Sequence, residues 1–105
     1  MKKLLTTLTL AALVAVPSIS SAHTPLLSCF DNGDGTILCQ AGFSNGNSAA
    51  GIKAVLADAS GKELVVSKFD ENGEITLDKP EGDYTVTMDG GEGHIVKVPS
   101  SKITE

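Results

Sequence analysis

The sequence has 105 residues, with 13 acidic against eight basic side chains and a formal charge of −5 at pH 7. A chain this acidic repels phosphate backbones and anionic lipid and attracts cations, which argues against nucleic-acid binding. Its length fits one small domain, whose core has limited stability unless a cross-link reinforces it.

Residues 1–22 have the features of a secretory signal peptide. A basic start, an uncharged apolar stretch of 13 residues, a helix breaker and two small residues follow one another as Lys2 and Lys3, residues 4–16, Pro17, and Ser20 with Ala22. This order predicts cleavage after Ala22, so that His23 begins the mature chain. The apolar stretch is shorter than the roughly 20 residues of a membrane-spanning helix, so we expect a periplasmic product that is not inserted in the membrane.

An alternative cleavage would make the protein a lipoprotein. The segment LLSC, residues 26–29, is similar to a lipoprotein cleavage box, in which Cys29 carries the lipid. A polar, proline-containing stretch separates this cysteine from the apolar region, which favours cleavage after Ala22. The mature chain 23–105 then keeps six basic and 13 acidic residues, a formal charge of −7.

Cys29 and Cys39 are the only cysteines, and both lie in the exported part. An oxidising compartment makes a disulfide between them the default. The segment CFDNGDGTILC is typical of a hairpin, and pairing the two cysteines centres its turn on Asp34, with Gly33 and Gly35 available for positive φ. The alternative is a redox or metal-thiolate pair, but the spacing is neither C-x-x-C nor that of a zinc site.

The rest of the mature chain is divided by turn signals rich in Gly, Asn and Asp. The runs between them alternate apolar and polar residues, and no window has a helical period. We therefore predict seven strands, at about residues 25–31, 35–43, 51–58, 62–69, 73–78, 82–89 and 93–99. They favour an all-β fold, an antiparallel β-sandwich of immunoglobulin-like or transthyretin-like type over residues 23–99, with a flexible tail at 100–105.

Two acidic turns, DNGDG at 31–35 and DENGE at 70–74, bring oxygen ligands close together. Neither matches the spaced series of ligands that wraps a calcium ion. Asp, Asn and Gly are also the residues that tight turns require, so the turn interpretation is preferred.

The two histidines, His23 and His94, are predicted to share one end of the sandwich. Odd-numbered strands of an antiparallel run begin at the same end, and these residues precede the first and the seventh strand. The α-amine and imidazole of His23 form a six-membered chelate on a divalent transition metal, and the imidazole of His94 completes a three-nitrogen site. Pro25 has no N–H, so the metal cannot be wrapped further along the backbone. Asp89 and Glu92 are candidate supporting carboxylates at the same end.

The plain alternative has His23 in a frayed terminus and His94 facing solvent, with no site between them. Met88 is a soft ligand by type, but it continues the apolar row of Tyr84 and Val86 and is predicted to be core.

Several segments resemble one known group of proteins: AH at 22–23, GIKAVLADASGKEL, GDYTVTMDGG and GEGH at 91–94. The resemblance is to small exported proteins encoded beside nickel and cobalt uptake transporters, which have a His directly after the signal peptide, a carboxypeptidase-regulatory-like β-sandwich and a G-x-G-H motif. It implies a role in nickel or cobalt uptake, a membrane metal transporter as partner, and His23 and His94 as metal ligands. Copper stays open, because Cu(II) outranks Ni(II) at most nitrogen sites.

The expected function is therefore the capture of a divalent transition metal ion for uptake or buffering. A metal-free sandwich module for adhesion or assembly is the alternative. An enzyme is not expected, because two histidines at one end do not make up a Ser/His/Asp set and the mature chain has only four aromatic residues for a substrate-binding face.

Overall fold

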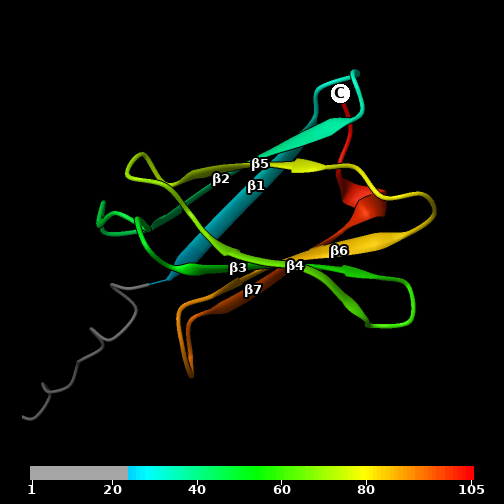
Figure 1. The fold of residues 1–105 in the computed structure, drawn as a ribbon. Helices are drawn as coiled ribbons and strands as arrows, with labels where there is room; N and C mark the ends of the chain where they lie inside the picture. The colour runs from blue at the N-terminus through cyan, green and yellow to red at the C-terminus, as the bar shows by residue number, and fades with distance from the viewer. Residues whose placement is uncertain (1–23) are drawn as a thin grey trace, which may run out of the picture.

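A computed structural model describes residues 24–105 (Figure 1). It contains seven strands and one short 3₁₀ helix: β1 (Pro25–Asp31), β2 (Thr36–Phe43), β3 (Lys53–Asp58), β4 (Glu63–Lys68), β5 (Glu74–Asp78), β6 (Tyr84–Asp89), β7 (Ile95–Pro99) and η4 (Ser100–Lys102). Each strand begins and ends within two residues of its predicted bounds. The predicted all-β fold of seven antiparallel strands is confirmed.

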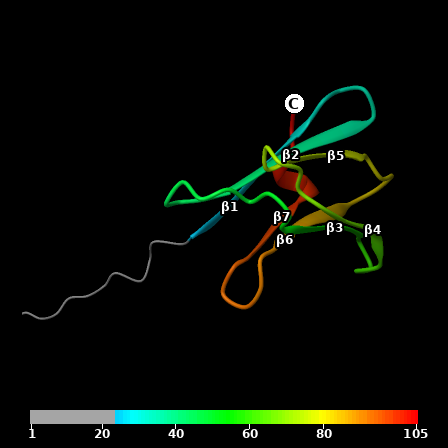
Figure 2. The same cartoon turned by 60° about the vertical axis from the view of Figure 1, so that its left-hand side comes forward.

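The strands form two sheets, a three-stranded sheet of order β1-β2-β5 and a four-stranded sheet of order β4-β3-β6-β7. All neighbours are antiparallel. Figures 1 and 2 show the sheets as two layers of an open sandwich. The strand order matches that of an immunoglobulin-like sandwich, except that the fourth strand, β4, pairs in the sheet of β3, β6 and β7 instead of the sheet of β1, β2 and β5. The sequence pattern predicted the strands but not their division between the sheets.

The core lies between the sheets and is formed by alternate residues of each strand. Its fully buried side chains include Ile37 and Cys39 of β2, Val86 and Met88 of β6, and Phe69, which follows β4. The core position predicted for Met88 is thereby confirmed. Full burial of an apolar side chain of this size contributes roughly 1.5–3 kcal/mol to the free energy of unfolding.

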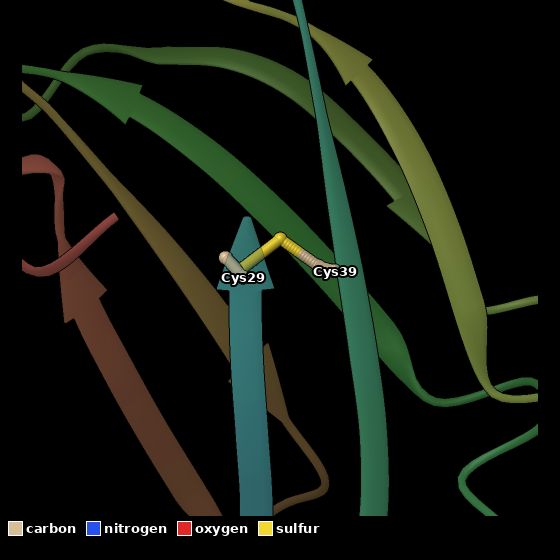
Figure 3. The surroundings of a disulfide bond; sticks show 2 residues. All are labelled: Cys29 and Cys39. Carbon is tan, nitrogen blue, oxygen red and sulfur yellow. A yellow bond between two sulfur atoms is a disulfide. The ribbon is translucent and has the colours of Figure 1, made fainter. Parts of the chain in front are cut away.

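The predicted disulfide joins Cys29 to Cys39, and no free cysteine is found between residues 24 and 105. Figure 3 shows it bridging the neighbouring strands β1 and β2. The two residues face each other directly in the antiparallel register, with their Cα atoms 4.0 Å apart. Gly33 and Gly35 in the turn have φ angles of 81° and 92°, as predicted for these glycines.

The last residues differ from the flexible tail predicted for residues 100–105. Ile103 is buried in the core, and Thr104 forms a parallel bridge with Phe30. The N–H of Asp31 donates a hydrogen bond of 3.0 Å to the carbonyl of Thr104. One apolar residue in a short segment gives no periodicity, which is why the sequence pattern missed this packing.

The acidic turns use their carboxylates to brace the backbone, as the turn interpretation predicts. Oδ1 of Asp70 accepts hydrogen bonds from the N–H groups of Asn72 and Glu74 at 2.8 and 2.9 Å. Oδ1 of Asp31 accepts from the N–H of Gly33 at 2.9 Å. Such side-chain-to-backbone bonds are the reason that Asp is frequent in turns.

An ion pair joins β1 to the turn that follows β5. Nζ of Lys79 lies 2.6 Å from Oδ2 of Asp31. The hydrogen bond from Lys79, followed by that from the N–H of Gly33, lowers the pKa of Asp31 below its ordinary value, and the hydrogen bond to Asp31 raises the pKa of Lys79. The carboxylate is therefore held in its charged form by the folded chain.

Reduction of the disulfide should lower the free energy of unfolding by about 2–3 kcal/mol, because the bond closes a loop of about ten residues in the unfolded chain. Urea unfolding of the oxidised and the reduced protein, followed by far-UV circular dichroism, measures the difference. The double variant Cys29→Ala/Cys39→Ala is the control, since reductant has no bond to break in it. Equal midpoints for the oxidised and reduced parent would contradict the prediction.

Lys79→Met should raise the pKa of Asp31 toward its ordinary value, because the main cause of the lowered pKa is removed. A pKa lowered by folding stabilises the protein above the unfolded value of 3.8, and this stabilisation is lost as the pH falls through the folded-state pKa. The parent should therefore lose more stability than the variant on acidification. Carboxyl ¹³C NMR titration measures the pKa, with Lys102→Met as the control; an unchanged Asp31 titration in Lys79→Met would refute the assignment.

Candidate functional site

The first described residue, Thr24, is fixed to the end of β2. Its N–H donates to Oγ of Ser44 at 3.1 Å, and its carbonyl accepts from the N–H of Ser44 at 2.8 Å. Directly beside it, Pro25 faces Phe43 in the register of β1 and β2. The start of β1 therefore lies against the residues that end β2.

His94 lies at the end of the β6–β7 turn, immediately before β7. Its backbone closes this turn, because its N–H donates to the carbonyl of Gly91 at 2.8 Å and its carbonyl accepts from the N–H of Gly90 at 2.9 Å. Gly91 and Gly93 have φ angles of 101° and 84°, a region that other residues rarely adopt. The glycines of the GEGH segment thus allow the turn that presents His94.

Phe43 connects the two features. Its ring lies edge to face with the imidazole of His94, with centroids 6.0 Å apart and an interplanar angle of 79°. This arrangement is one of the favourable geometries of aromatic pairs. Because Phe43 also faces Pro25, the start of β1 and His94 lie at the same end of the sandwich. Figures 1 and 2 both show the start of β1 and the β6–β7 turn on one side of the molecule.

The convergence of the first and seventh strand starts is thereby confirmed for the described residues. His23 itself lies outside them, as do the predicted signal peptide and its predicted cleavage site. The presence of the His23 nitrogens beside His94 stays a prediction.

A surface hollow of about 340 Å³ lies next to the imidazole, lined by Phe43, Asn47, Gly90 and His94. A Cβ atom at Gly90 would lie 3.2 Å from Cβ and from the carbonyl oxygen of His94. Because glycine has no Cβ, the backbone of residue 90 can come this close to His94. By alternation along β2, Phe43 is on the same face as the buried Ile37 and Cys39, and Asn47 lies in the turn SNGNS at residues 44–48. The sequence of this turn indicates no site, because its place beside His94 depends on the pairing of distant strands.

The predicted carboxylates differ in what they do. Oδ1 of Asp89 accepts from the N–H of Gly91 at 3.0 Å, so this side chain braces the turn that leads to His94. Glu92 is exposed at the tip of the same turn. Within residues 24–105, no group of three or more His, Cys, Asp or Glu side chains is arranged to hold a metal ion. The predicted site takes two of its three nitrogens from His23, beyond that part of the chain.

No family model matches the chain, and no curated protein or solved structure is significantly similar to it. The resemblance to proteins of nickel and cobalt uptake therefore depends on the quoted motifs alone. Residues 24–105 also include no helix that is both long enough and apolar enough to cross a membrane.

Proposed function

We propose that the protein is exported to the periplasm and captures one divalent transition metal ion through the α-amine and imidazole of His23 and the imidazole of His94. The observation that supports this most directly is the contact chain at one end of the sandwich. Thr24 is hydrogen-bonded to Ser44, and the adjacent Phe43 packs against the His94 ring. A residue that precedes Thr24 is attached at this end.

The backbone beyond His23 favours a distant third ligand. A metal held by an N-terminal amine can otherwise take nitrogen ligands from the following amides. Here the N–H of Thr24 already donates to Ser44, and Pro25 has no N–H to lose. His94 is the one other imidazole of the sequence, and neutral imidazole is a common ligand of Ni(II), Co(II) and Cu(II).

The charge of the protein favours cation capture. The chain that remains after cleavage carries a formal charge of −7, which raises the concentration of cations near its surface. Asp89 at the end of β6 and Glu92 in the following turn precede His94 and add negative charge to this end of the sandwich. The resemblance adds the destination: delivery of the ion to a membrane metal transporter, or buffering of it in the periplasm.

Mature protein beginning at His23 should bind one Ni(II), Co(II) or Cu(II) ion per chain in titration calorimetry, after intact mass confirms the N-terminus. His94→Ala should weaken binding at least about tenfold, or roughly 1.4 kcal/mol, because one of the three ligands is lost. One extra glycine before His23 should have a similar effect, because it moves the α-amine out of the chelate. Affinity should fall as the pH is lowered, since protons compete for all three nitrogens.

Glu81→Gln is the control for this titration, because it removes an acidic charge from the β5–β6 turn at the opposite end of the sandwich. It should bind as the parent does. If His94→Ala and the extended protein also bind as tightly as the parent, the three-nitrogen site does not exist.

A metal-free assembly module remains the second candidate. The distribution of exposed apolar side chains over the two sheets favours it.

A further inference from the structure

The large apolar side chains that are exposed within residues 24–105 lie on strands of both sheets and point away from the core. They are between 44% and 56% exposed: Leu26, Phe30, Leu64, Val66 and Ile95. On β1, Leu26 and Phe30 alternate with the inward side chains of Leu27 and Cys29. They therefore belong to the outer face of the three-stranded sheet.

The outer face of the four-stranded sheet carries the other exposed apolar residues. Val66 faces Val55 across β4 and β3, and the same row continues through Thr87 to Lys97. Ile95 lies on this face in the adjacent row, and Leu64 is the extra residue where the β3–β4 register shifts. Both sheets thus present apolar side chains to solvent.

The four-stranded outer face also carries three lysines. Lys53 lies directly opposite Lys68 in the neighbouring row, and Lys97 is on the same face. On its other side Lys53 faces Asp89 of β6, so it has one like charge and one opposite charge as cross-strand neighbours. Three lysines share the face with the acidic residues Glu63 and Asp89 in a protein that is strongly acidic overall.

The three-stranded outer face has the opposite charge. Glu74 and Asp78 of β5 alternate with the inward side chains of Ile75 and Leu77. Nε2 of Gln40 donates to Oε2 of Glu74 at 2.9 Å and holds this carboxylate across β2 and β5. The outward residues of β1, β2 and β5 include no basic side chain. One molecule therefore carries an apolar face with three lysines against two acidic residues, a net formal charge of +1, and an apolar face that is acidic.

The faces also differ in shape. Two shallow hollows of about 290 and 220 Å³ lie on the four-stranded face, and both are lined by Val55, Glu63, Thr87 and Lys97. The three-stranded face carries Phe30, an aromatic side chain that is 45% exposed. A cavity of about 150 Å³ is enough to hold a benzene molecule, so either hollow has room for this ring.

We propose that copies of this chain stack face to face, with the three-stranded outer face of one copy on the four-stranded outer face of the next. Phe30 enters the hollows over Val55, while Glu74 and Asp78 lie against the lysines of the partner. The contact joins two different faces. The copy at each end of a stack therefore keeps one face free, and further copies can add there. The proposal does not involve His23 or His94.

The affinity should be low and sensitive to salt. Three strands of this length cover a face of only about 14 by 20 Å, or about 280 Å² per copy, which is below the roughly 800 Å² per partner of a standard specific interface and fits only a weak contact. The charges at its rim are screened over a Debye length of about 10 Å at 0.1 M salt. Sedimentation velocity at low ionic strength, from about 10 to 500 µM, should show an average mass that rises past that of a dimer and falls back in about 0.5 M salt.

Two variants test the direction of the contact. Phe30→Lys damages only the three-stranded face, and Val66→Glu damages only the four-stranded face. Each variant alone should stay monomeric, because every contact needs one intact face of each kind. An equimolar mixture should form dimers and no larger species, since each variant supplies the face that the other has lost.

Both side chains are exposed, and circular dichroism with thermal unfolding checks that the variants fold as the parent does. Leu26→Lys and Ile95→Glu replace either variant that fails this check. Ser101→Lys and Ser101→Glu, outside both faces, are the charge-matched controls and should associate as the parent does. A monomeric parent over the whole range, a variant that dimerises alone, or a mixture that stays monomeric would overturn the proposal.

Discussion

The direct pairing of Cys29 with Cys39 is the constraint on which the rest of the structure depends. In a strand the side chains alternate between the faces, so a shift of the register by one residue would turn every inward residue of β1 outward. The disulfide joins two opposite residues and excludes such a shift. The same register places Pro25 opposite Phe43, which fixes the start of β1 beside the ring that contacts His94.

The sequence predicted the strands well because turns divide the chain so clearly. Gly33, Gly73 and Gly82 all have positive φ in turns that were expected from Gly, Asn and Asp alone. The division into sheets was not predictable in this way, since alternation shows which face a residue occupies and not which strand lies beside it. The pairing of β2 with β5 joins strands that are far apart in the chain.

For the site, sequence parity placed the starts of β1 and β7 at one end, and the contacts of Phe43 and Thr24 agree. This prediction does not depend on the division into sheets. Every connection reverses the direction of the chain, so the odd-numbered strands all begin at the same end. The ring contact itself could not be predicted, since it depends on the packing of β2 against a turn between β6 and β7. Nor could the packing of Ile103, whose neighbour Thr104 forms a bridge with Phe30 at the other end of β1.

The edges of the two sheets help to explain why the faces are the available route to association. Unpaired strand edges invite further strands, and proteins commonly protect them with proline, charge or a bulge. Here Pro25 begins β1 and Pro99 ends β7. On β4, the register shift at Leu64 and the positive charge of Lys68 protect the edge in the same way. Addition of a strand to these three of the four edge strands is therefore disfavoured. The exposed apolar residues lie instead on two faces of opposite charge, where side chains rather than backbone groups decide which surface fits.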